Sequence, residues 1–129
     1  MENQYGFGKT VQGDFAGTRE RVIDELGKEG FGVLTEIDVA ATMKKKLDHD
    51  MAPYVILGAC NPPFAKRAIE AEPTIGLLMP CNVVVRQDAA GIQVEFMDPG
   101  LMSQMTANDA VVELAKEVRE KIRRVMDAV

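Results

Sequence analysis

A β-hairpin signature around residue 90 constrains the fold more than any other feature of this sequence. Residues 82–87 form a strand candidate with the apolar core Val83-Val84-Val85, and residues 92–97 alternate apolar and polar positions as a return strand would. Between them, Asp88-Ala89-Ala90-Gly91 supplies a turn with glycine where a positive φ is tolerated. A hairpin places an antiparallel pair in the sheet, which disfavours a doubly wound parallel fold.

The other periodic segments extend this hairpin into an α+β order. Further strands are predicted at residues 5–12, 31–37 and 53–59, and helices at 15–29, 39–47, 62–71 and 106–129. Residues 74–79 fit one helical turn, and residues 99–105 form a Met-rich connection. The order β-α-β-α-β-α-β-β-α favours a curved, mainly antiparallel sheet with the two long helices on one face. No repeat or linker divides the chain, so we expect a single domain over residues 1–129.

Helix starts are marked by capping residues. Asp14 and Asp38 are predicted N-caps, Gly30 suits a left-handed helix end, and Asn61 with Pro62 forms an N-cap and N1 pair. Thr106 followed by Asp109 resembles a capping box for the last helix, with Asp in place of the usual Glu.

Charge and composition exclude several classes of partner. The chain has 129 residues and a net charge of −5, which disfavours binding to a phosphate backbone, so we expect no nucleic-acid partner. The one basic run, Lys44-Lys45-Lys46, stands beside Asp48 and Asp50, as on a solvated helix face. No stretch is long and apolar enough for a membrane span, and the first residues do not resemble a signal peptide. With only two cysteines, we expect a reducing, cytoplasmic location.

Two Cys-Asn pairs form the candidate site. Cys60-Asn61 ends one strand candidate and Cys81-Asn82 begins the next, and each pair stands beside proline. If these two strands run antiparallel, both cysteines lie at the same edge of the sheet, whereas parallel strands would separate them. The sequence leaves both arrangements open. We predict ligand-binding residues at Cys60, Asn61, Cys81 and Asn82, and a metal site, if there is one, at Cys60 and Cys81.

Each cysteine admits a chemical and a packing interpretation. A thiol at a helix N-terminus is stabilised as thiolate by the helix dipole, although a free cysteine is commonly a small buried apolar residue. Three methionines, Met97, Met102 and Met105, invite a soft-metal interpretation because thioether and thiolate suit Cu(I), although adaptable packing explains them as well. His49 is the only histidine and falls in a polar loop. Standard nucleotide, zinc-protease and Ser-His-Asp motifs are absent, and no cofactor is indicated.

The resemblance to a known family is carried by four segments. They are GFGVLTEIDV (residues 30–39), ATMKKKL (41–47), PYVILGACNPP (53–63) and EAEPTIGLLMPCNVVV (70–85). These blocks resemble the signature segments of domain-of-unknown-function family 302, and ACNP and PCNVVV are the most distinctive of them. The resemblance implies a compact α+β domain with a TBP-like curved antiparallel sheet, and a homodimer. It implies no activity, substrate or cofactor. It also implies a glycine after the KKL block, where this chain has Asp48.

Three functional hypotheses follow from these observations. The first is a binding domain for a small ligand or soft metal ion at the cysteine-containing site. The second is an enzyme that uses Cys60 as a nucleophile or redox thiol, for which the sequence supplies no complete catalytic set. The third is a structural or assembly role as a homodimer.

Overall fold

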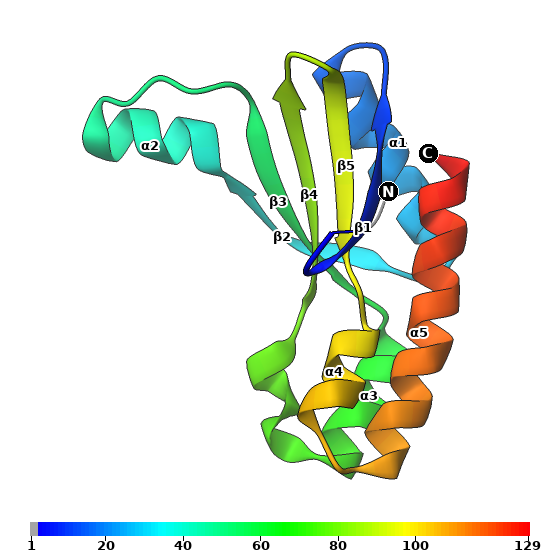
Figure 1. Ribbon diagram of the computed structural model, residues 1–129. Coiled ribbons are helices and arrows are strands. Elements are labelled where there is room, and N and C mark those ends of the chain that lie inside the picture. Colours follow the sequence, from blue (N-terminus) through cyan, green and yellow to red (C-terminus); the bar gives the residue numbers. More distant parts are fainter. Residues whose placement is uncertain (1–2) are drawn as a thin grey trace.

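The structure is a computed structural model that describes residues 3–129, and it has the predicted α+β order (Figure 1). The strands are β1 (Gly6–Val11), β2 (Gly32–Asp38), β3 (Tyr54–Cys60), β4 (Cys81–Asp88) and β5 (Gly91–Met97). The helices are α1 (Phe15–Lys28), α2 (Val39–Leu47), α3 (Pro62–Ala71), the 3-10 helix η1 (Pro73–Leu78), α4 (Gly100–Met105) and α5 (Asp109–Ala128). No helix within residues 3–129 combines the length and apolar character needed to cross a bilayer.

The sheet is an open, fully antiparallel structure with the strand order β1-β5-β4-β3-β2. The predicted hairpin is confirmed: Asp88 pairs with Gly91 at its tip, and Gly91 has the expected positive φ of 139°. The N-terminal strand β1 pairs with β5, so the two strands most distant from each other in the sheet are β1 and β2. A register shift between Val33 and Thr35 interrupts the pairing of β2 with β3.

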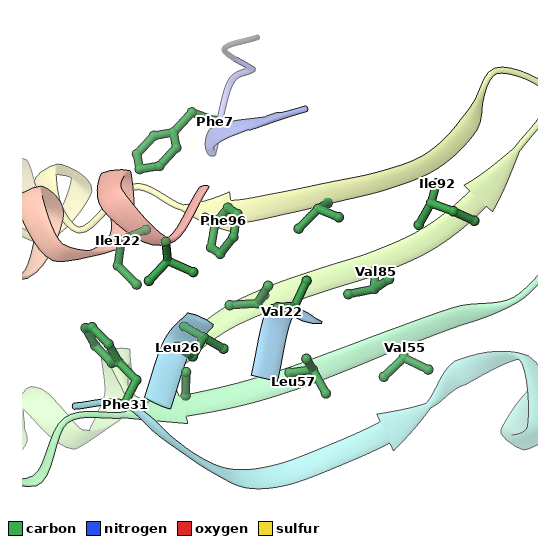
Figure 2. Packing of buried hydrophobic residues seen from close by; sticks show 14 residues of the cluster. Phe7, Val22, Leu26, Phe31, Val55, Leu57, Val85, Ile92, Phe96 and Ile122 are labelled. Atoms are coloured by element: carbon green, nitrogen blue, oxygen red, sulfur yellow. The ribbon is translucent and has the colours of Figure 1, made fainter. Parts of the chain in front are cut away.

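The two long helices, α1 and α5, cover one face of the sheet and close the hydrophobic core. Val22 and Leu26 of α1 and Ile122 and Val125 of α5 are buried in one cluster with apolar side chains of the strands (Figure 2). The strand residues alternate between this face and the other, as the pleat requires. The buried strand members of the cluster are Phe7, Val55, Leu57, Ala59, Val83, Val85, Ile92, Val94 and Phe96.

Helix α2 is packed differently from the other long elements. It stands away from the sheet beside β3, and none of its residues is buried (Figure 1). Its apolar positions Val39, Met43 and Leu47 recur every four residues and therefore share one side of the helix. Leu47 is 71% exposed, so the C-terminal end of this apolar row is uncovered, whereas Val39 and Met43 are half-buried.

Most helix boundaries agree with the capping residues in the sequence. The Asp14 carboxylate accepts a hydrogen bond from the Gly17 amide at 2.8 Å, and the Asp38 carboxylate accepts one from the Ala41 amide at 2.9 Å. Helix α2 ends at Asp48, whose φ of 51° is left-handed, as expected where the family resemblance implies a glycine.

Two expectations near the C-terminal helix were wrong. The connection at residues 99–105 contains the short helix α4. The N-cap of α5 is Asn108, whose side chain accepts from the Ala110 amide at 3.0 Å, so Thr106 and Asp109 do not form a capping box. The Thr106 hydroxyl oxygen instead accepts from the Asn108 amide at 3.0 Å, one step before the helix begins.

Candidate functional site

The pairing of β3 with β4 decides between the two arrangements that the sequence left open. The strands are antiparallel, and Ala59 lies directly opposite Cys81. Cys60 is the last residue of β3 and Cys81 is the first residue of β4. Both cysteines therefore lie at the same end of these two neighbouring strands, which is the edge of the sheet meant here, and neither forms a disulfide.

A pocket of about 60 Å³ lies at this edge, and both cysteines line it. It lies at the end of the molecule where α3, α4 and the first half of α5 gather below the sheet (Figure 1). Apolar side chains of these elements form most of its wall, including Phe64 from α3 and Leu114 from α5. Apart from the thiols, Asn61 is the one polar residue among the described residues that line it.

Asn61 fixes the corner between β3 and α3 by a contact that its N-cap position does not predict. It occupies the N-cap of α3, but its side chain makes no capping hydrogen bond. Its Nδ2 instead donates to the backbone carbonyl of Glu29 at 3.2 Å, in the turn between α1 and β2. Asn61 is 8% exposed, and this bond ties the wall of the pocket to an element 32 positions away in the chain.

The electrostatics of the pocket favour the protonated form of Cys81. Although Cys81 keeps some surface exposure, burial of its thiol raises its pKa from 9.0 to about 11, and the nearby Cys60 adds to the effect. A thiol with such a pKa is almost entirely neutral near pH 7. The pocket therefore has no charge from Cys81 at neutral pH.

Two positive side chains lie beside Phe64, a residue of the pocket wall. The Arg67 guanidinium carbon is 5.4 Å and the Lys121 Nζ 5.9 Å from the centroid of the Phe64 ring. Phe64 itself lines the pocket. Both cations also face carboxylates, because Arg67 lies 3.4 Å from Glu117 and Lys121 lies 3.9 Å from Glu29. Helix α3 begins at Pro62, just after Cys60 and Asn61, so the positive end of its dipole also points to this corner.

The structure brings three of the four predicted site residues together and places the fourth elsewhere. Asn82 follows Cys81 in β4, so its side chain points to the other face of the sheet, and it lines two different hollows. One of these is a hollow of about 560 Å³ on the open face, shared with Tyr54 and Glu95. His49 lies in the loop before β3 and is therefore near the opposite end of that strand from Cys60.

The predicted methionine group is partly correct in location. Met97, Met102 and Met105 all line a hollow of about 250 Å³ next to the cysteine pocket, and only Met102 also lines the pocket itself. The second methionine in the pocket wall is Met79, which the sequence analysis did not select. The signal for Met79 was present in the chain, because it stands two residues before Cys81 at the start of a strand.

Within residues 3–129, no cluster of three or more His, Cys, Asp or Glu side chains is arranged to hold a metal ion. Any metal ion in this pocket would therefore need other donors than those of the common zinc and calcium sites.

Comparison with known proteins identifies the family of the chain. The chain is similar to a crystal structure of an uncharacterized conserved protein DUF302 from Bacillus stearothermophilus, at 27% sequence identity and a TM-score of 0.89, with 98% of each chain covered. No curated protein matches the sequence. The family described as "Domain of unknown function DUF302" matches residues 7–129. This range contains the cysteine pocket, all the long helices and all the strands, except that Gly6, the first residue of β1, lies just outside it. The chain therefore belongs to the DUF302 family.

Proposed function

We propose that this protein is a binding domain whose ligand, a species of only a few atoms, occupies the pocket beside Cys60, Asn61 and Cys81. One observation carries the proposal: two cysteines that are 21 positions apart in the chain line a single, mostly apolar pocket at one edge of the sheet. Pockets that combine apolar walls with a few convergent polar groups are the usual form of small-molecule sites.

The size of the pocket limits the ligand. Drug-sized molecules occupy pockets of roughly 300–1,000 Å³, and an apolar cavity of roughly 150 Å³ accepts benzene. The cysteine pocket measures about 60 Å³, so a cofactor or a metabolite with an extended skeleton does not fit. A single ion or a compact uncharged molecule does.

The geometry supports binding better than nucleophilic catalysis. The raised pKa of Cys81, which burial causes, makes that thiol a poor nucleophile near neutral pH. The only histidine, His49, is separated from Cys60 by the length of β3, roughly 20 Å for seven residues, so it is not placed to act as a base.

Xenon and a panel of uncharged molecules of up to about six heavy atoms test the pocket. We expect saturable shifts of the methyl resonances of Met79 and Met102 in ¹³C-methyl NMR spectra, because both residues line the pocket. Met43 and Met51, beyond the other end of β3, are internal references whose resonances stay unchanged.

A pair of variants on α3 provides the matched control. Ala65→Leu adds a larger side chain to the pocket wall and is expected to abolish the shifts, whereas Ala71→Leu, at an exposed position of the same helix, leaves them intact. Shifts that persist in Ala65→Leu would refute the proposed binding site, and shifts that are absent with every probe would exclude uncharged ligands from it.

Self-assembly is a second candidate function, and the uncovered side of α2 favours it. Four exposed large hydrophobic residues lie in the segment from β2 to the loop after α2: Leu34, Ile37, Leu47 and Met51. We propose that a second copy of the chain covers them. Helix α2 has the acidic N-cap Asp38 at its start and Lys45 and Lys46 in its last turn, beside Lys44, which pairs with Asp48 and Asp50. Two copies packed antiparallel about a two-fold axis place Asp38 of each near Lys45 and Lys46 of the other.

Sedimentation equilibrium tests this assembly. The wild-type chain is expected to form a dimer that Leu47→Asp weakens by burying a charge in the contact. Leu77→Asp is the matched control, because Leu77 is 87% exposed on η1, at the other end of the molecule. A wild-type chain that stays monomeric at high concentration, or equal effects of the two substitutions, would refute the assembly.

A further inference from the structure

Sulfur-containing residues are concentrated around the cysteine pocket. The chain has two cysteines and eight methionines, and four of these ten residues line one cavity of about 60 Å³. They come from four different places in the chain: the end of β3, the segment after η1, the start of β4, and α4. In that order, they are Cys60, Met79, Cys81 and Met102.

The donor set indicates the kind of ion that it would bind. Thiolate sulfur binds both Cu(I) and Zn(II), but thioether sulfur suits Cu(I) and is not among the usual zinc ligands, which are Cys, His, Asp and Glu. Carboxylate and carbonyl oxygens suit calcium and magnesium. Within the described chain, no cluster of three His, Cys, Asp or Glu residues supplies the harder donors. Apart from Asn61, the rest of the pocket wall is apolar and provides no carboxylate or imidazole to replace the water of a doubly charged, strongly hydrated ion.

We propose that the pocket holds one soft monovalent metal ion of the Cu(I) class, with the thiolates of Cys60 and Cys81 and the thioethers of Met79 and Met102 as ligands. This assignment rests on the proposed binding function and specifies its ligand. The cavity is too small for most molecules but large enough for a single ion, because each ion replaces no more than the volume of a few water molecules.

Binding is an exchange of protons for metal without any redox step. Cu(I) forms a bond to each of the two thiol sulfurs, and each thiol releases one proton to water, so the bound site has a net charge of −1. The positive end of α3, which begins at Pro62 just after Cys60 and Asn61, lies where it offsets that charge. The two thioethers complete the coordination without adding charge.

Anaerobic titration with Cu(I) in competition with a chromophoric Cu(I) chelator tests the site. We expect one ion per chain and an ultraviolet thiolate-to-Cu(I) band, with affinity that rises with pH because protons are released on binding. Zn(II) under the same conditions is expected to bind much more weakly. Cys60→Ser and Cys81→Ser are expected to remove the band, and each should lower the affinity by at least about 100-fold.

The methionine variants keep the test informative even if a cysteine variant folds poorly. Met79→Leu and Met102→Leu conserve side-chain volume, so the fold is retained, and each is expected to reduce Cu(I) affinity by at least about tenfold. Met43→Leu on α2 and Met105→Leu at the exposed end of α4 are the matched controls and should leave the affinity unchanged.

The outcomes separate this inference from the proposed function. Absence of a one-to-one Cu(I) complex, or unchanged affinity in both Met79→Leu and Met102→Leu, overturns the metal assignment. If xenon still shifts the Met79 and Met102 methyl resonances in that case, the pocket remains a site for small uncharged ligands. If neither Cu(I) nor xenon binds, both proposals fail.

Discussion

Gly6 lies so close to the backbone of β5 that a side chain at this position would collide with it. A Cβ atom built on Gly6 would be 1.9 Å from the Phe96 carbonyl oxygen and 2.9 Å from the Asp98 amide nitrogen. Backbone atoms cannot move aside as the end of a flexible side chain can. Gly27 in α1 is the opposite case, because a Cβ atom there would meet nothing within 4 Å.

This contrast predicts opposite effects of the same substitution. Gly6→Ala should destabilise the protein by about 1–3 kcal/mol, since the strand must shift to accommodate the methyl group. Gly27→Ala should stabilise it by about 0.5–1 kcal/mol, since alanine restricts the unfolded chain and favours helix. Urea denaturation measures both, and a neutral Gly6→Ala would show that β1 does not approach β5 so closely.

The Cys81 thiol predicts a pH dependence of stability. Its pKa is raised from 9.0 to about 11 by burial, so the folded chain holds the proton more tightly than the unfolded chain. The contribution of this proton to the free energy of unfolding is fully present below about pH 9. As the pH rises to about 11, the free energy of unfolding falls by about 2 kcal/mol. Urea unfolding between pH 8 and 11 should show a smaller decline for Cys81→Ala than for the wild type. Parallel declines would contradict the buried thiol.

At the site, the residues could be predicted from the sequence, but the relative direction of the two strands and the faces to which the side chains point could not. The sequence analysis selected Cys60, Asn61 and Cys81 from their positions beside strands, and the structure places all three on the pocket. The 20 residues between the cysteines are long enough for either a parallel or an antiparallel return, so their approach could not be predicted. Asn82 shares the motif of Asn61 but points to the other face, because neighbouring residues in a strand alternate.

Among the elements, helix α5 has an N-cap that the sequence pattern did not identify. Two candidate residues, Thr106 and Asn108, stand before the helix, and both make hydrogen bonds there. Asn108 is the N-cap, and its Nδ2 also donates to the Ala71 carbonyl at 3.0 Å, which ties the start of α5 to the end of α3. That second bond is a tertiary contact, which a capping pattern in the sequence does not contain.

Replacing Asn108 should separate the two contributions. Asn108→Ala removes both bonds and should cost about 1–2 kcal/mol in the free energy of unfolding. Asn108→Asp keeps the side-chain acceptor and adds a negative charge at the helix N-terminus, so it should recover most of the loss. Thermal or urea unfolding measures both variants, and equal losses would show that Asn108 does not act as the N-cap.

Helix α4 shows where element prediction failed. Pro99-Gly100 reads as a turn, and a helix of six residues has too few positions to show a period. Its start is held locally, because the Asp98 carboxylate accepts from the Gly100 amide at 2.8 Å and from Arg119 of α5 at 2.9 Å. The contact with Arg119 comes from a distant segment, so the sequence alone could not reveal it.

Across the whole molecule, the stability of the elements is expected to be uneven. Helix α5 contributes five buried residues, whereas α2 contributes none. If local opening of α2 costs about 3 kcal/mol less than opening of α5, its amides exchange about 100-fold faster. Hydrogen exchange followed by NMR at low protein concentration measures the ratio, and equal protection of α2 and α5 would contradict it.

The overall fold was more accessible to prediction than the site, for a physical reason. In the hairpin, the alternating strands and the amphipathic α5, the spacing of apolar residues shows which face of each element is buried. The order β-α-β-α-β-α-β-β-α therefore followed from local signals. The position of β1 beside β5, and the closing of α3 and α4 around the cysteines, depend on contacts between distant segments.

The strand order has a consequence for folding during synthesis on the ribosome. Val11 pairs with Ile92 and Gly6 with Met97, so β1 has no partner strand until residues 92–97 have also been synthesised. Closing so long a loop is entropically costly and slow. The nascent chain must therefore keep β1 out of incorrect pairings during translation, and Lys9 in that strand is the type of residue that discourages them.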